Sequence, residues 1–131
     1  VIAAEPGRVL SAAAATLIVE VIGKQRRDGV LWYTIDAGVY GPFSGRYFRW
    51  DDWEFIPLNI SPERYDHVEE ASIAGPSCDG GDIVCLDRWL PRLEIGDRLA
   101  IPNMGAYCNV SASQFNGLPV TDEIWYSDAI P

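Results

Sequence analysis

The stretch TLIVEVIGKQRRDGVLWYTID, residues 16–36, decides the fold class. Apolar side chains recur at every second position on both sides of Arg27-Asp28-Gly29, which is the period of a β-strand with one buried face. An Asp-Gly pair between two such runs is a strong signal for a tight hairpin turn. The stretch therefore predicts two strands, over 16–25 and 30–36. Their apolar faces carry Leu17, Val19, Val21, Leu31, Tyr33 and Ile35.

Shorter segments on either side of this hairpin extend the pattern. The apolar run at 1–4 is expected to be a buried strand, and the alanine-rich stretch 9–15 a short helix. Segment 82–86 fits a strand or one helical turn. Further strands are expected downstream, at 55–60, 68–74, 98–101 and 123–126. Short strands with many Gly and Pro turns predict a mainly β domain, closed as a Greek-key-like β-barrel.

Length and charge exclude several classes of function. The 131 residues fit one domain or a piece of one, and their net charge is −9. We expect neither a nucleic-acid partner nor an anionic membrane surface, because both require a basic face. No run of about 18 apolar residues occurs, so no transmembrane helix is expected. Because the chain begins with an apolar run and not with Met, we expect it to be a piece of a larger enzyme.

The cysteine and histidine content argues against a metal site. Three cysteines are present, Cys78, Cys85 and Cys108, and they form no Cys-x-x-Cys pair. The single histidine, His67, adds no cluster of the kind that binds zinc. An odd number of free thiols favours a reducing compartment, so a cytoplasmic location is expected.

Polar residues beside glycines follow four of the apolar segments. These stretches are Glu5-Pro6-Gly7-Arg8, residues 36–41, residues 75–79 and residues 103–107. Loops at strand ends, held by a rigid sheet, are where binding and catalytic sites are built. Each stretch alone indicates only a turn, and their order along the chain carries more information.

Four sequence motifs, taken together and in order, resemble one family. They are EPGR (5–8), GPSCDGGD (75–82), LPRLEIGDRL (90–99) and NMGAYCNVSASQFNGLP (103–119). They are similar to those of the fold-type III, pyridoxal-phosphate-dependent decarboxylases that act on ornithine, lysine, arginine or diaminopimelate. The resemblance implies that residues 1–15 are the last strand and helix of a (β/α)8 barrel. Residues 16–131 would then form a C-terminal β-barrel domain like that of alanine racemase.

The resemblance also implies which residues hold the cofactor, pyridoxal 5'-phosphate. Glu5 resembles the carboxylate that pairs with the pyridine nitrogen and keeps the ring an electron sink. Gly7, Arg8 and Tyr107 resemble the phosphate-binding residues, and a guanidinium fork suits a phosphate. From the residues alone, Glu5 is equally a helix-start carboxylate beside Pro6. Likewise, Arg8 is a surface arginine and Tyr107 a core aromatic with a satisfied hydroxyl.

Cys78 and Asp79 resemble the residues that reach into the active site of a neighbouring subunit. Cys78 would donate a proton to the α-carbon after carbon dioxide leaves. Adjacent Asp79 and partial burial would keep that thiol protonated until it acts. Asp79 would hold the distal amine of the substrate. From the residues alone, Cys78 is a small buried hydrophobe, as expected for Cys85 and Cys108, and Asp79 is a turn residue.

A second substrate-binding position stays open between two residues. The resemblance implies that Tyr40 is a substrate-binding residue. Family members that act on ornithine carry an aromatic-Asp pair shortly after the segment matching Tyr40. The position corresponds to Arg49 without a gap and to Asp51 with a two-residue insertion. A shift of two leaves the facing of a strand unchanged, so periodicity does not decide. Asp51 favours a diamino acid, Arg49 an anionic distal group, and the other motifs favour a diamino acid such as ornithine or lysine.

The chain lacks one residue that the family needs. Its only lysine, Lys24, precedes the hairpin turn, whereas the family's cofactor-bearing lysine lies early in the barrel. We therefore expect a partner, a barrel domain or chain that carries this lysine, and a homodimer with shared active sites acting on a small amino acid. Two alternatives are a regulatory homologue without activity and an amino-acid racemase. A racemase needs a base on each side of the substrate, and the Cys78-Asp79 pair suits one-sided protonation better.

Overall fold

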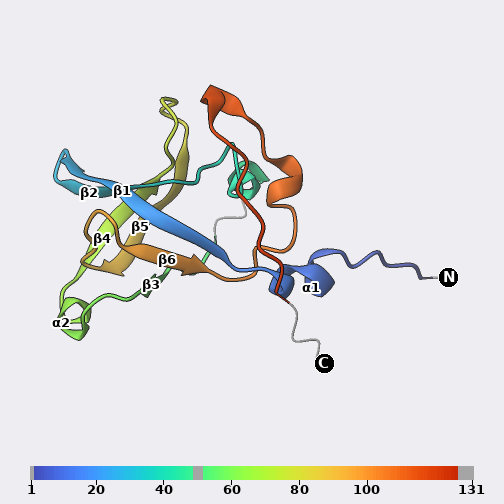
Figure 1. Cartoon of the computed structure of the whole chain (residues 1–131), viewed down its shortest axis with the longest axis horizontal. Coiled ribbons are helices and arrows are strands. Elements are labelled where there is room, and N and C mark those ends of the chain that lie inside the picture. The colour runs from blue at the N-terminus through green and yellow to red at the C-terminus, as the bar shows by residue number, and fades with distance from the viewer. Residues whose placement is uncertain (1, 49–51, 127–131) are drawn as a thin grey trace.

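A computed structural model describes residues 2–48 and 52–126 of the chain. Its core is one six-stranded sheet with the strand order β3-β6-β1-β2-β4-β5 (Figure 1). The sheet curls into a half-barrel whose edge strands are β3 and β5, which confirms the mainly β, barrel-like class. The strands are β1 (Leu17–Arg27), β2 (Val30–Ile35), β3 (Ile56–Leu58), β4 (Val68–Ala74), β5 (Ile83–Pro91) and β6 (Arg98–Ile101).

The β1–β2 hairpin forms where the sequence predicts it. Asp28 and Gly29 both have positive φ, 51° and 86°, which is the conformation of the tight turns that fit twisted antiparallel strands. A register shift between Val21 and Gly23 divides β1. Its first half, Leu17 to Glu20, pairs with β6, and its second half pairs with β2. One bent strand therefore links the two halves of the curled sheet.

The remaining pairings extend the sheet on both sides of this hairpin. β4 runs parallel to β2 and antiparallel to β5, while β3 runs antiparallel to β6. Short helices lie in the connections. They are α1 (Arg8–Ser11), η1 (Ala12–Ala14), η2 (Ser44–Phe48), α2 (Pro62–Tyr65), η3 (Asn109–Ser111) and η4 (Phe115–Gly117). Over the described ranges, no helix has the length and apolar character needed to cross a bilayer.

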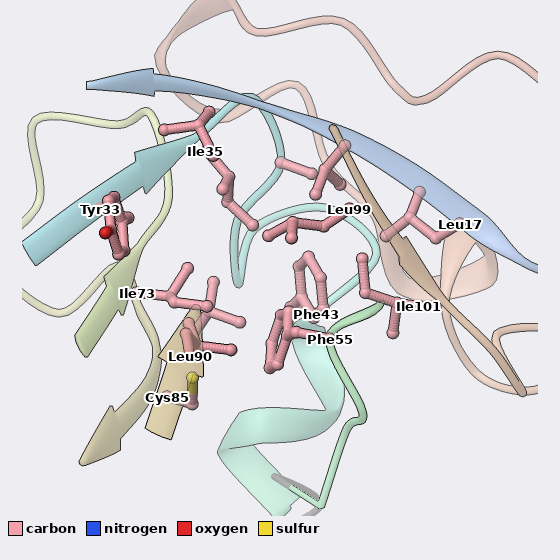
Figure 2. Packing of buried hydrophobic residues seen from close by; sticks show 14 of the residues in the cluster. Leu17, Tyr33, Ile35, Phe43, Phe55, Ile73, Cys85, Leu90, Leu99 and Ile101 are labelled. Atoms are coloured by element: carbon pink, nitrogen blue, oxygen red, sulfur yellow. The ribbon is translucent and has the colours of Figure 1, made fainter. Parts of the chain in front are cut away.

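The core fills the concave side of the curled sheet. The alternating residues of the hairpin all belong to it. Figure 2 shows three of them, Leu17, Tyr33 and Ile35, packed with Phe43, Phe55 and Leu99. Full burial of one such side chain contributes about 1.5–3 kcal/mol. The Tyr33 ring is fully buried, and its hydroxyl accepts a hydrogen bond from the Leu93 amide at 2.9 Å. This bond anchors the segment between β5 and β6 to the centre of the sheet.

Several sequence-based expectations were wrong in detail. Residues 2–6 form no strand and Ile2 is 99% exposed, and no strand forms over 123–126, where Trp125 is 89% exposed. An apolar run becomes a strand only when a neighbouring strand pairs with it. Segment 82–86 is a strand from Ile83 onward, and this strand continues to Pro91.

Candidate functional site

One group of predicted site residues gathers where α1 meets the segment after β6. The amides of Met104 and Gly105 donate to the carbonyl oxygens of Ala15 and Ala12, each at 2.9 Å. A Cβ on Gly105 would lie 2.0 Å from the Ser11 carbonyl oxygen, so only glycine allows this approach. The NMGAY motif is thereby held directly against the short helix that begins at Arg8.

This contact brings Gly7, Arg8 and Tyr107 together. The Arg8 guanidinium carbon lies 5.5 Å from the centroid of the Tyr107 ring. A Cβ on Gly7 would lie 2.8 Å from the Tyr107 hydroxyl oxygen, so that hydroxyl rests against the Gly7 backbone. Tyr107 has a φ of 60°, a backbone conformation that residues other than glycine adopt at a cost of about 1–2 kcal/mol. Such strain is often found at functional sites.

A cavity of about 650 Å³ opens beside this group. Its wall is lined by Arg8, Asp52, Trp53, Glu54, Pro102, Asn103 and Tyr107. A guanidinium fork and a phenol hydroxyl at one cavity are suitable donors for a phosphate. The residues present therefore fit the phosphate end of a pyridoxal cofactor. Glu5 lies two residues before Gly7 in the segment that precedes α1, and its side chain is exposed.

A second group of predicted site residues gathers at the loop between β4 and β5. The Tyr40 hydroxyl donates a hydrogen bond to the Asp79 carboxylate, which also accepts from the Gly81 amide at 3.0 Å. The bond from Tyr40, followed by that from Gly81, lowers the pKa of Asp79 below its usual range. The same bond to Asp79 raises the pKa of Tyr40. Asp79 is thus held as an exposed carboxylate.

The segment around η4 completes this second group. The Cys78 thiol donates to the side-chain oxygen of Asn116, with 3.7 Å between sulfur and oxygen. The rings of Phe115 and Tyr40 stack with their centroids 4.0 Å apart. Asn116 has a φ of 63°, again the left-handed region. Phe115 and Asn116 were not predicted as site residues from the sequence, although the turn signal Asn116-Gly117 lies within the motif at 103–119.

The two groups lie in different parts of the chain's fold. Figure 1 places the β4–β5 loop at the top of the molecule and α1 at its right. Cys78 and Asp79 are exposed, so the partial burial expected for the Cys78 thiol is not found in the single chain. Tyr107 is 51% exposed, so both groups present side chains to solvent.

Other predicted residues have separate outcomes. Arg49 and Asp51, the two candidates for the second substrate contact, lie outside the described residues. Cys85 and Cys108 are buried as expected, and burial raises the pKa of the Cys85 thiol to about 11. Lys24 is structural, because its ammonium donates to the Leu93 carbonyl at 2.7 Å and pairs with Glu94 at 3.0 Å. No group of three or more potential metal ligands occurs within 2–48 and 52–126.

Comparison with known proteins gives one consistent family. A family model for the C-terminal sheet domain of pyridoxal-dependent decarboxylases matches residues 10–105. The lysine/ornithine decarboxylase of Selenomonas ruminantium is 38% identical over 124 residues, which are 95% of this chain and 30% of that protein. This chain therefore spans about a third or less of the length of such relatives.

Solved structures agree with the sequence comparison. A lysine decarboxylase from Selenomonas ruminantium superposes with a TM-score of 0.82 and 35% identity, over 94% of this chain and 31% of that one. A lysine/ornithine decarboxylase from Vibrio vulnificus, complexed with cadaverine, superposes with a TM-score of 0.78 and 33% identity, over 88% of this chain and 31% of that one. Sequence and fold therefore point to the same family.

Proposed function

This chain belongs to the pyridoxal-dependent decarboxylases, whose C-terminal sheet domain it matches over residues 10–105, and we propose that it forms part of an enzyme that removes the α-carboxyl group of a basic amino acid such as lysine or ornithine. Residues 1–15 end the cofactor-binding barrel, and residues 16–131 are the β-domain. The observation that carries this proposal is the family match combined with Cys78 and Asp79 in one exposed loop.

Four residues of this chain would hold the cofactor. Arg8 and the Tyr107 hydroxyl bind its phosphate, beside the Gly7 backbone, and Glu5 pairs with its pyridine nitrogen. The chemistry that the bound pyridoxal group would supply is that of an electron sink for the α-carbon when carbon dioxide is lost. The distance of 5.5 Å between the Arg8 guanidinium and the centre of the Tyr107 ring supports the phosphate site, because it puts both residues side by side at one cavity.

Cys78 would act in the active site of a second copy of the chain. Its thiol is exposed and lies in a different part of the fold from Arg8 and Tyr107. A two-fold dimer brings such separated surfaces together, because each copy offers its own loop to the other's pocket. The thiol then donates its proton to the α-carbon, and the thiolate regains one from solvent before the next turnover.

Asp79 would select the substrate. The hydrogen bonds from Tyr40 and then Gly81 lower its pKa, which favours the charged form, and its side chain is exposed. An ammonium group is the complementary ligand for such a carboxylate. The complex of the Vibrio vulnificus relative with cadaverine, a diamine, supports a diamino acid as substrate. Tyr40 orients the carboxylate, and Asp51 or Arg49 is the remaining candidate for the distal end.

The family's cofactor-bearing lysine is absent from this chain, so a partner must supply it. We propose a barrel domain or a separate chain that carries it, in a homodimer located in the cytoplasm. Three free thiols, one of them exposed, suit that reducing compartment.

The proposal is tested by carbon dioxide release from lysine, ornithine and arginine in the full protein that contains this chain. Cys78→Ala should lose most turnover and keep the visible absorbance of bound cofactor. Cys108→Ala, which removes a buried thiol, is the matched control and should retain turnover once its stability loss is allowed for. Absence of any cofactor absorbance in the wild-type protein would favour a regulatory homologue. Unchanged turnover in Cys78→Ala would remove the thiol from the reaction.

A further inference from the structure

Asp82 is a buried carboxylate that joins two loops of the second group. The residue is only 3% exposed, which is uncommon for an aspartate. One oxygen accepts a hydrogen bond from the Val39 amide at 2.8 Å, and the other accepts from the Ser77 amide at 3.0 Å. Each of these donors directly precedes a residue of the second group, Tyr40 after Val39 and Cys78 after Ser77. One side chain therefore fixes the backbone on both sides of the Tyr40–Asp79 contact.

We propose that Asp82 is the positioning residue that holds the Cys78-Asp79 loop against Tyr40. This inference rests on the proposed function, because it gives Cys78 and Asp79 their roles. Asp82 does not touch the substrate or the cofactor. It sets where the thiol and the carboxylate stand when they enter a neighbouring active site.

Two glycines form a close-fitting space around this carboxylate. A Cβ on Gly38 or on Gly75 would lie 2.3 Å from one of its oxygens, closer than real side chains approach. Because the two glycines come from the two loops that Asp82 joins, neither loop can shift far without meeting the carboxylate. The loop from Gly75 to Asp82 therefore packs around the side chain of its last residue, Asp82.

The backbone of Asp82 makes separate contacts, which isolates the role of the side chain. The Gly75 amide donates to the Asp82 carbonyl at 2.8 Å, and the Asp82 amide donates to the Asp79 carbonyl at 3.0 Å. These bonds close the base of the loop whatever side chain stands at position 82. Only the carboxylate reaches across to Val39. An ionised carboxylate has acceptors on both oxygens, whereas an asparagine of the same shape presents a donor to one of the two amides.

The experiment uses Asp82→Asn in the full, cofactor-loaded protein, with Tyr33→Phe as the matched control. Tyr33→Phe also leaves a buried amide, that of Leu93, without its acceptor, but in another part of the fold. Hydrogen exchange measured by mass spectrometry should rise about tenfold or more over 37–40 and 76–81 in Asp82→Asn, and only near Leu93 in the control. This readout does not depend on catalysis.

A double-mutant cycle with Cys78→Ala gives the functional readout. If Asp82 acts through Cys78, Asp82→Asn should lower kcat several-fold alone and lower it far less when Cys78 is already alanine. If the kcat loss of the double variant equals the product of the two single-variant losses, the proposal is overturned. Unchanged hydrogen exchange over 76–81 in Asp82→Asn would overturn it as well. If the wild-type protein releases no carbon dioxide, the proposed function is contradicted instead. Hydrogen exchange in Asp82→Asn would still decide whether Asp82 holds the two loops.

A wild-type measurement covers the case in which Asp82→Asn does not fold. The amides of Ser77 and Val39 should exchange at least about tenfold more slowly than that of Gly80, because they donate to a buried carboxylate. Equal exchange at these three amides would overturn the positioning role.

Discussion

Replacing Gly105 by alanine tests how the NMGAY motif is held against α1. The new methyl group would lie 2.0 Å from the Ser11 carbonyl oxygen, whereas real contacts of this kind begin near 3.0 Å. The two segments must therefore separate by about 1 Å, the difference between these distances. The hydrogen bonds that join them, from the amides of Met104 and Gly105, are 2.9 Å long and would be broken by that movement.

The cost follows from these two bonds. Each contributes about 0.5–1.5 kcal/mol net, so the segment from 103 to 107 should open more easily by about 1–3 kcal/mol. Exchange of the Met104 and Gly105 amides should then rise about 5- to 150-fold. Since α1 and η1 contribute no buried residue, the loss should stay local, and amides of the β1–β2 hairpin should keep their protection.

The assay is site-resolved hydrogen exchange, together with the affinity of the full protein for pyridoxal phosphate. Affinity should fall, because Arg8 and Tyr107 no longer face one anion. Gly80→Ala is the matched control, since a Cβ there meets nothing within 4 Å. Normal exchange at residues 104 and 105 in Gly105→Ala would refute the reasoning, and so would an equal effect of Gly80→Ala.

Three further predictions concern titration and thiol access. Tyr40→Phe removes the main hydrogen bond that lowers the pKa of Asp79, so this pKa should rise toward its usual value in a carboxyl NMR titration. Burial raises the pKa of Cys85 from 9.0 to about 11, so the thiol favours the folded state below pH 9. As pH rises from about 9 to 11, up to about 3 kcal/mol of this stability should be lost in urea titrations. Cys78 should react with iodoacetamide before Cys85 and Cys108, because it alone of the three is exposed.

Each of these predictions has an outcome that contradicts it. If the pKa of Asp79 is the same in Tyr40→Phe as in the wild type, the hydrogen bond from Tyr40 is not its cause. Tyr65→Phe, which removes another exposed hydroxyl, is the control and should leave the pKa of Asp79 unchanged. If Cys85→Ala loses stability between pH 9 and 11 as steeply as the wild type, that thiol is not the cause. Simultaneous alkylation of all three thiols would mean that the native fold does not shield the two buried ones.

Much of the sheet could be predicted from the sequence because its signals are local. Alternation in 16–36 and the Asp28-Gly29 turn predict β1 and β2, and the short apolar run at 98–101 predicts β6. The full length of β5 could not be predicted in the same way. Asp87 has a φ of 54°, and the register with β4 shifts nearby, so the strand continues through an irregularity that breaks the alternation.

The candidate site was predicted residue by residue but not as an arrangement. Tyr40 and Asp79 were expected as separate substrate contacts, and only the fold shows that one donates to the other. The role of Asp82 depends on two glycines distant in sequence, Gly38 and Gly75, which come together in space. A carboxylate that follows Gly80-Gly81 looks like an ordinary turn residue until its burial is known. Long-range packing therefore carries the information that motifs lack.

The most direct test of shared active sites is a mixed dimer. Two inactive forms of the full protein are unfolded and refolded together. One carries Cys78→Ala, and the other carries both Arg8→Ala and Tyr107→Phe. If Cys78 serves the pocket of the partner, half of the random dimers have one intact site, and about a quarter of wild-type carbon dioxide release should return. If Cys78 instead serves the same chain's own Arg8 and Tyr107, every subunit of a mixed dimer still contains a defective site. Activity would then stay at the level of the parents, which would contradict the account.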